Sequence, residues 1–162
     1  MKPKLYHALF LFLTISINIK ATELPDFELK DIQNKYVSLE ELKGEKLTVI
    51  DFWATWCKPC FKSIPSIIEI NREFRDKGVN VIGISIDSPR NSAKVKPFAI
   101  SLGIDYPVLL DVNSEVMGMA NVTSVPTLII INEKNEIVYL HEGYKPGDEN
   151  IIKEEITNLL NQ

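Results

Sequence analysis

The sequence predicts one α/β domain, with a central mixed β-sheet and helices on both of its faces. Short apolar runs typical of buried strands alternate with segments of helical periodicity from residue 47 onward, and this alternation is typical of an α/β sheet. Of the 162 residues, 45% are hydrophobic and 25% are charged, as expected for a single globular domain with a sizeable core. No internal repeat, low-complexity segment or Gly/Ser-rich linker divides residues 22–162, so we interpret them as one domain.

The first 21 residues differ from the rest of the chain. Lys2 and Lys4 precede an apolar run over residues 8–19, and no acidic residue occurs within residues 1–21. This arrangement predicts a secretory signal peptide. The run has only 12 residues, whereas a stable membrane-spanning helix takes about 20, so cleavage is favoured over permanent anchoring. An uncleaved anchor is the alternative, and in both cases the domain is expected to be extracytoplasmic.

The domain is predicted to open with a β-hairpin. Residues 27–29 and 36–38 are short extended segments separated by a polar turn. Ser38, followed three residues later by Glu41, has the pattern of a capping box, in which each side chain bonds the other's backbone N–H. We therefore expect one helical turn after the hairpin, ending near Gly44.

A strand, a helix and a second strand follow. Residues 47–52 form an apolar run with bulky or β-branched residues on both faces, which predicts a buried central strand. Residues 59–77 have the spacing of a helix that ends before a glycine, with a kink expected at Pro65. Residues 79–86 are expected to form a second buried strand. The apolar positions of the helix are Ile64, Ile67, Ile68 and Phe74.

The second half of the domain is predicted to continue the alternation. Residues 92–102 read as a helix, residues 107–110 as a short strand and residues 112–120 as a short helix. Residues 127–131 and 137–140 are then expected to pair as a hairpin.

A final amphipathic helix is predicted to open at or near Pro146, because the first helical turn tolerates a residue without an N–H. Its apolar side is expected to pack against the sheet. The residues assigned to that side are Ile151, Ile152, Ile156, Leu159 and Leu160.

Cys57 and Cys60 are the only cysteines of the chain. A structural disulfide framework would need more cysteines, spread along the sequence. A closed zinc site would need four ligands, and the two histidines, His7 and His141, lie far from the cysteines in sequence, so no metal is expected. Redox chemistry is the function that remains for this pair.

The position of the pair at a predicted helix start supports that chemistry. A reactive cysteine must be a thiolate, which requires a pKa lowered from about 8.5. The free N–H groups and the dipole of a helix N-terminus stabilise that charge on Cys57, and Cys60 lies on the same side within disulfide reach. Pro59 suits the first turn, and the cation of Lys58 also favours the thiolate. Two buried, inert cysteines are the alternative.

Residues 49–60, V-I-D-F-W-A-T-W-C-K-P-C, resemble the active-site strand and loop of the thioredoxin superfamily. Residues 25–56 resemble the N-terminal hairpin region of its TlpA/ResA/DsbE-like members, in the AhpC/TSA-redoxin branch, and residues 92–110 resemble their added central segment. Val125-Pro126-Thr127 is similar to the superfamily's cis-proline loop. The resemblance covers nearly all of residues 24–160. It implies a thioredoxin fold with an added N-terminal β-hairpin and a central helix/strand insertion.

The resemblance also implies roles for individual residues. Cys57 would be the exposed nucleophile and Cys60 the resolving thiol, and the two would form the redox-active disulfide. Pro126 would follow a cis peptide bond, and the backbone of Val125 would bind an extended segment of the partner; an ordinary trans proline at a strand start is the alternative. The implied substrate-binding residues are Trp56, Lys58, Pro59, Val125 and Pro126.

Asp51 corresponds in the resemblance to a buried acid of thioredoxin. On an apolar strand its carboxyl should have a raised pKa, and it could take the proton that Cys60 must lose, with water as the bridge. The alternative is a partly exposed aspartate at the strand end. Many similar chains carry a glutamate where Ser63 stands here, which leaves Asp51 as the expected proton carrier.

The predicted function is therefore that of an exported thiol-disulfide oxidoreductase, without a cofactor, that acts on protein thiols and disulfides. The resemblance favours a periplasmic reductase, serving cytochrome c maturation with apocytochrome c as a partner, or general thiol reduction. Its electron donor would be a membrane protein of the DsbD/CcdA type. The formal net charge of −4 argues against a nucleic acid as a partner.

Two other functions are compatible with a cysteine pair at this position. A thiol peroxidase of the peroxiredoxin type would use a cysteine near the same place, but it needs a hydroxyl residue three positions earlier, whereas Thr55 precedes Cys57 by two. A binding module without redox activity would hold polypeptides beside Pro126, which would leave both cysteines without a role.

Overall fold

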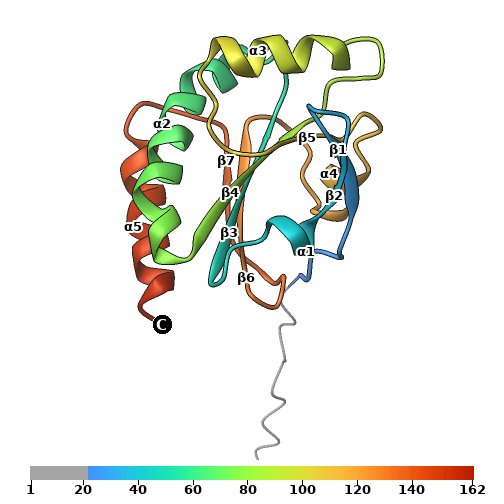
Figure 1. The fold of residues 1–162 in the computed structure, drawn as a ribbon. Coiled ribbons are helices and arrows are strands. Elements are labelled where there is room, and N and C mark those ends of the chain that lie inside the picture. Colours follow the sequence, from blue (N-terminus) through green and yellow to red (C-terminus); the bar gives the residue numbers. More distant parts are fainter. Residues whose placement is uncertain (1–21) are drawn as a thin grey trace, which may run out of the picture.

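A seven-stranded mixed sheet, in the order β2-β1-β5-β4-β3-β6-β7, forms the centre of the computed structural model (Figure 1). The structure describes residues 22–162, so the signal peptide predicted for residues 1–21 lies outside the described residues. The strands are β1 (Glu28–Asp31), β2 (Tyr36–Ser38), β3 (Leu47–Trp53), β4 (Val79–Ser85), β5 (Val108–Leu110), β6 (Thr127–Asn132) and β7 (Ile137–Glu142).

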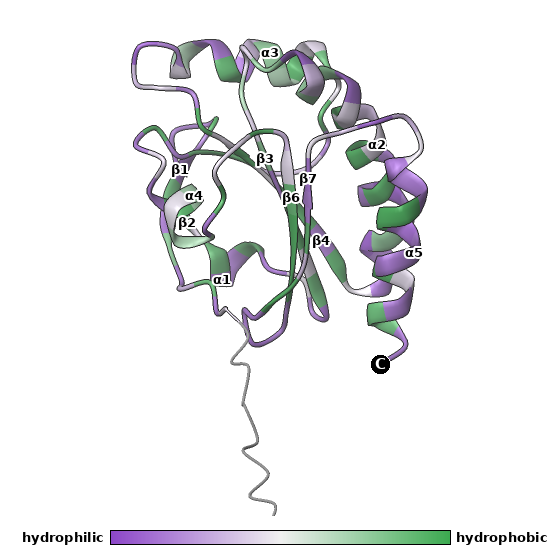
Figure 2. Ribbon diagram, turned by 180° about the vertical axis from the view of Figure 1, so that it is seen from behind, coloured by the Kyte–Doolittle hydropathy of each residue, from purple (hydrophilic) through white to green (hydrophobic). Residues whose placement is uncertain are grey.

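Helices cover both faces of this sheet, as predicted. One core cluster joins α2, α3 and α5 to the sheet, and a second lies on the opposite face with α1 and α4. The view from behind in Figure 2 shows α4 and α1 on the side away from α2 and α5. The bounds are α1 (Leu39–Leu42), α2 (Lys58–Phe74), α3 (Val95–Ser101), α4 (Glu115–Met119) and α5 (Asp148–Leu160), with 3₁₀ turns at Arg75–Lys77 and Ser92–Lys94.

Strand β3 lies inside the sheet, parallel to β4 and antiparallel to β6. Every residue of β3 is buried. Successive side chains of the strand point to opposite faces of the sheet, and a core cluster covers each face. Val49 and Trp53 pack in the cluster with α2, whereas Ile50 and Phe52 pack in the cluster on the other face. By the same alternation, Asp51 points toward the α2 face.

The predicted N-terminal hairpin and its capping box are confirmed. Strands β1 and β2 pair antiparallel, and β1 also pairs antiparallel with β5, which attaches the hairpin to the sheet. The Ser38 hydroxyl accepts the N–H of Glu41 at 3.2 Å, and the Glu41 carboxylate accepts the N–H of Ser38 at 2.8 Å. The helical turn α1 therefore begins where the sequence predicted.

Helix α5 differs from the expectation in two details. Helix α5 begins at Asp148 after the N-cap Gly147, so Pro146 precedes the cap, and Ile151 is 54% exposed, which makes its assignment to the packed side wrong. At 100° per residue, Ile151 falls outside the stripe that Ile152 and Ile156 bury. Helix α2 includes Pro65, as its predicted range required.

Within residues 22–162, no helix has both the length and the apolar character that crossing a bilayer requires.

Candidate active site

The two cysteines lie where β3 passes into α2, as predicted. Cys57 is the N-cap residue of α2, and its Sγ accepts the N–H of Cys60 at 3.2 Å. The two sulfurs are joined in a disulfide, with Cα atoms 5.3 Å apart. No acidic residue occurs in the first turn of α2, so the positive end of the helix dipole acts on Cys57 without a competing negative charge there.

The structure corrects the expectation that Cys57 is exposed. Cys57 is only 4% exposed in this disulfide form, and Cys60 is fully buried. Cys57 is therefore not the open nucleophile that was expected, because its sulfur is bonded to Cys60 and packs within the core cluster of α2. Of the two, Cys57 alone retains any surface. The neighbouring side chains of Trp56, Lys58 and Pro59 are exposed around it.

A buried carboxylate holds the loop that leads to Cys57. Asp87, which follows β4, is 1% exposed. One of its oxygens accepts the hydroxyl of Thr55 at 2.6 Å, and the other accepts the N–H of Thr55 at 2.7 Å and the hydroxyl of Ser85 at 3.0 Å. Thr55 is thus fixed through both its backbone and its side chain.

This contact bears on the peroxidase alternative. A peroxidase would need a free hydroxyl near Cys57 to polarise the peroxide, and the Thr55 hydroxyl already donates to Asp87. The geometry therefore favours thiol-disulfide exchange over peroxide reduction.

Asp51 is buried, which rules out the partly exposed alternative. It is 1% exposed, and burial raises the pKa of its carboxyl from 3.8 to about 7. Among the described residues, its Oδ2 atom has no hydrogen-bond partner. A carboxyl with a pKa near neutrality exchanges a proton readily at physiological pH, as the proposed role of Asp51 requires.

A small cavity adjoins Asp51. Its volume is about 10 Å³, which is close to the space that a single water occupies. Ser63 lies at its wall, and its hydroxyl donates to the carbonyl of Cys60 at 3.1 Å. The cavity therefore lies beneath the first turns of α2. Its lining is Asp51, Ser63, Ser66, Ile67, Pro126, Leu128, His141, Gly143, Tyr144 and Ile152.

The Val125–Pro126 peptide bond is cis, as the resemblance implied. Pro126 directly precedes β6, whose first residue, Thr127, lies opposite Phe52 of β3. Its carbonyl accepts the N–H of Gly143 at 2.8 Å. Pro126 is buried and Val125 is partly buried, and both lie at the end of the sheet from which the cysteine loop leaves.

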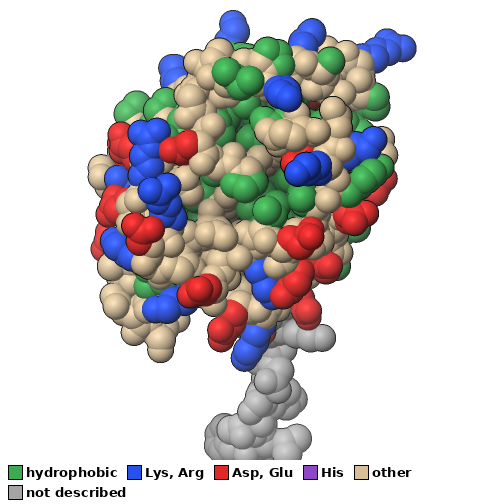
Figure 3. Space-filling view, in the orientation of Figure 1, with side chains coloured by type: hydrophobic (Ala, Val, Ile, Leu, Met, Phe, Trp, Pro, Cys, Tyr) green, Lys and Arg blue, Asp and Glu red, His purple; other side chains and the backbone are tan. Residues whose placement is uncertain are grey.

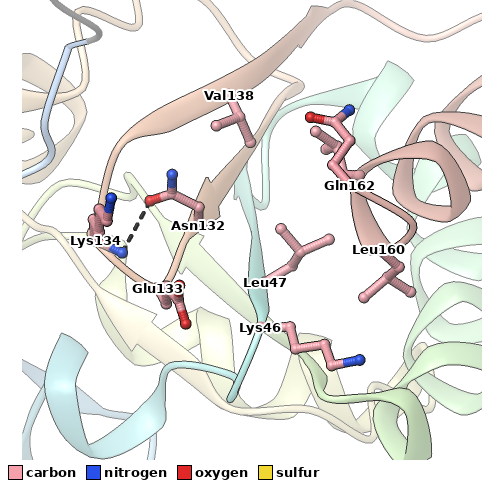
Figure 4. Close-up of a pocket in the computed structure, with 9 residues that line it drawn as sticks. Lys46, Leu47, Asn132, Glu133, Lys134, Val138, Leu160 and Gln162 are labelled. Atoms are coloured by element: carbon pink, nitrogen blue, oxygen red, sulfur yellow. Dashed lines mark hydrogen bonds between the residues drawn. The ribbon is translucent and has the colours of Figure 1, made fainter.

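A second hollow lies at the opposite end of the sheet and contains none of the predicted site residues. Its volume is about 330 Å³, and it is formed by the start of β3, the end of β6 and the end of α5 (Figure 4). Because β3 runs from Leu47 to Trp53, this hollow is separated from Cys57 by the length of the strand.

Two features of the site were not foreseen from the sequence. Asp87 was not singled out, although a carboxylate directly after a buried strand is a signal that could have marked it. Phe98 of α3 packs on Trp53 and Phe61, with ring centroids 6.0 and 4.9 Å apart respectively. Figure 3 shows apolar side chains gathered beneath α3 on the face it presents. The inserted helix thus covers the start of α2.

Among residues 22–162, no group of three or more His, Cys, Asp and Glu side chains is arranged to hold a metal ion.

Comparisons with known proteins agree with this geometry. Residues 21–140 match the profile of the AhpC/TSA family. The chain is 34% identical to the thiol-disulfide oxidoreductase ResA of Bacillus thuringiensis (strain Al Hakam), over 72% of this chain and 65% of that protein. It is 36% identical to the thioredoxin-like protein YneN of Bacillus subtilis (strain 168), over 75% and 70%. The chain thus spans slightly less than two thirds of the ResA relative.

Among solved structures, one described as a thiol:disulfide interchange protein DsbE, from Chlorobium tepidum, superposes with a TM-score of 0.78 at 25% identity. The match covers 87% of this chain and 97% of that one. The predicted thioredoxin fold is therefore confirmed.

Proposed function

We propose that this chain, which belongs to the AhpC/TSA family, is a thiol-disulfide oxidoreductase that exchanges disulfides with partner proteins through Cys57 and Cys60. One observation carries the proposal: the two cysteines are already joined at the N-terminus of α2, with Cys57 as the N-cap and Cys60 fully buried behind it. This order supports attack by Cys57 and resolution by Cys60. The thiol-disulfide oxidoreductases named ResA, to which the chain is similar, support the same activity.

The first step uses the reduced form of the protein. The Cys57 thiolate, stabilised by the N–H groups of α2, attacks one sulfur of a disulfide in the partner. A mixed disulfide forms between Cys57 and that sulfur, and the other sulfur leaves as a thiolate and takes up a proton from solvent. Trp56, Lys58 and Pro59 are exposed beside the reacting sulfur, and Val125 would bind the partner's backbone.

The second step releases the partner. Cys60 loses its proton to the carboxylate of Asp51, through a water in the cavity beside it, and attacks the Sγ of Cys57. The Cys57–Cys60 disulfide forms, and the partner's remaining sulfur leaves as a thiolate. That thiolate also takes up a proton from solvent, so the partner gains two electrons and two protons, while the chain loses two electrons and passes the Cys60 proton to Asp51.

The proposed compartment, electron donor and substrate rest on the resemblance to TlpA/ResA/DsbE-like proteins. We propose that the protein is exported, that it works as a reductase in the bacterial periplasm, and that a membrane donor of the DsbD/CcdA type returns electrons to the Cys57–Cys60 disulfide. Apocytochrome c is the proposed substrate, with general thiol reduction as the broader form of the same role. A measured midpoint potential near that of thioredoxin, about −270 mV, would support reduction.

An insulin-reduction assay tests the activity. The wild-type domain should reduce insulin with dithiothreitol as the electron source, and Cys57→Ser should abolish the acceleration because the attacking sulfur is gone. Cys60→Ser should retain attack but not resolution, so it should accumulate mixed disulfides with its partners. Equal activity of the wild type and Cys57→Ser would refute the proposal, and so would the absence of any mixed disulfide in Cys60→Ser.

A further inference from the structure

A row of four paired residues crosses the sheet beside the cysteines. Asp51 of β3 lies opposite Gly83 of β4 on one side and opposite Leu128 of β6 on the other, and Leu128 lies opposite His141 of β7. Directly paired residues project from the same face of a sheet. Because neighbouring strands are about 4.8 Å apart, the backbones of Asp51 and His141 are separated by about 10 Å, with only Leu128 between them.

The small cavity spans this gap. Asp51, Leu128 and His141 all line it, and its volume of about 10 Å³ is close to the space of one water. The Oδ2 atom of Asp51 is buried and lacks a hydrogen-bond partner among the described residues. A buried polar atom beside a cavity of this size is normally satisfied by a water.

His141 connects this cavity to the surface. Its side chain is 20% exposed, and its Nε2 atom lies 3.0 Å from the carboxylate of Asp148, which is 16% exposed. Its Nδ1 atom lies 3.4 Å from the hydroxyl of Tyr139. The N–H of Lys145, and then His141, hold the pKa of Asp148 below its ordinary value. Asp148 is therefore a carboxylate that can stabilise a protonated imidazole.

We propose that His141 carries the proton of Asp51 to solvent. This inference rests on the proposed function, in which the Asp51 carboxyl must be ionised before it can take the proton of Cys60 in the resolving step. The protonated Asp51 carboxyl gives its proton, through a water in the cavity, to the neutral His141 imidazole. The imidazolium, paired with Asp148, then releases the proton to solvent. Histidine is suited to this step because its ordinary pKa lies near neutrality.

Other titratable groups also face this region. The Tyr106 hydroxyl is buried and has no partner among the described residues, and burial, followed by the charge of Asp51, raises its pKa well above the ordinary value. It therefore stays protonated and cannot accept the proton. Tyr144 lines the cavity but donates its hydroxyl to Glu149 at 3.2 Å and is bonded to Ser66 at 3.3 Å. His141 is thus the group of this set that is left to accept the proton.

The test measures the resolving step in single turnovers. Reduced protein is mixed with a peptide disulfide in weakly buffered solution, and release of the second peptide thiol is followed. His141→Ala should slow this release about tenfold, less than the roughly 100-fold effect of losing a direct acid or base, because solvent still reaches the opened cavity. Added imidazole should restore the rate to within about twofold of the wild type, since it replaces the missing side chain.

Two further variants complete the experiment. His141→Gln keeps a hydrogen-bonding side chain beside Asp148, but the amide cannot accept and release a proton, so this variant should be slow as well. It replaces the alanine variant if that variant fails to fold. Leu140→Ala changes the neighbouring, 44% exposed residue of β7 and should behave as the wild type. Wild-type release rates in both His141 variants would overturn the inference, and so would a slow rate that imidazole does not restore. Failure of the proposed function itself would instead appear as activity that survives Cys57→Ser.

Discussion

The contact between Asp87 and Thr55 shows how a single carboxylate orders the approach to Cys57. Asp87 accepts three hydrogen bonds at 2.6 to 3.0 Å, two of them from Thr55. A hydrogen bond to a charged group contributes about 1.5–3 kcal/mol, more than a neutral one. Because Asp87 is 1% exposed, removing one of its donors leaves a buried charge that is only partly compensated.

We therefore expect Thr55→Val to destabilise the domain by about 2 kcal/mol, whereas Thr55→Ser, which keeps the hydroxyl, should cost less than about 1 kcal/mol. Urea unfolding of the oxidised proteins measures both values. The attack of Cys57 on a small disulfide should also slow in Thr55→Val, because the loop before the N-cap loses one of its two attachments. Equal stability of the two variants would show that the hydroxyl contact contributes nothing.

At the scale of the elements, local patterns predicted most of the chain. The apolar run of β3, the capping box of α1 and the glycine after the first 3₁₀ turn are each visible as a pattern within a few consecutive residues. The helical position of the cysteines followed from the same kind of information. The cis bond before Pro126 came from resemblance alone, because few X-Pro bonds are cis.

The contacts that the sequence could not predict depend on the pairing of strands that lie far apart in sequence. Asp87 meets Thr55 only because β4 lies beside β3, and His141 meets the Asp51 cavity only because β6 and β7 follow on the other side. Strand order is not encoded in any single segment. The failure at Ile151 has a different cause, since neighbouring isoleucines in a helix point about 100° apart and only one of them, Ile152, lies in the buried stripe.

Two isoleucines of helix α5 test which side of the helix is buried. Ile156 is fully buried and Ile151 is 54% exposed. Ile156→Ala should destabilise the domain by about 2–5 kcal/mol, through lost burial and the cavity left behind. Ile151→Ala should change the free energy of unfolding by less than about 0.5 kcal/mol, as is usual for the surface. Thermal or urea unfolding distinguishes them, and similar losses in the two variants would contradict the helix orientation.

At the scale of the whole molecule, Asp51 couples folding to pH. Its pKa is about 7 in the folded protein against an ordinary 3.8, so between these values the folded state binds more protons than the unfolded state. The free energy of unfolding must then fall as pH rises through this window and level off above it. A shift of this size corresponds to a penalty on the order of 4 kcal/mol for the ionised carboxyl.

Asp51→Asn removes the ionisation and should therefore make the oxidised protein more stable than the wild type at pH 8. The difference should shrink toward pH 4, where the wild-type carboxyl is protonated in the folded state and has begun to be protonated in the unfolded state as well. Urea unfolding across this range measures it, with Glu154→Gln as the control because Glu154 is exposed. A difference that does not vary with pH would mean that Asp51 is not the titrating group.

The order of the strands along the chain also separates disulfide formation from completion of the active site during synthesis. Cys57 and Cys60 are three residues apart, so their sulfurs can bond as soon as that segment has been synthesised. Strands β6 and β7, which bring Pro126 and His141 to the site, come from residues 127–142, far later in synthesis. A nascent chain can thus become oxidised well before it is able to turn over a substrate, and oxidation of these two sulfurs does not by itself report that the protein has matured.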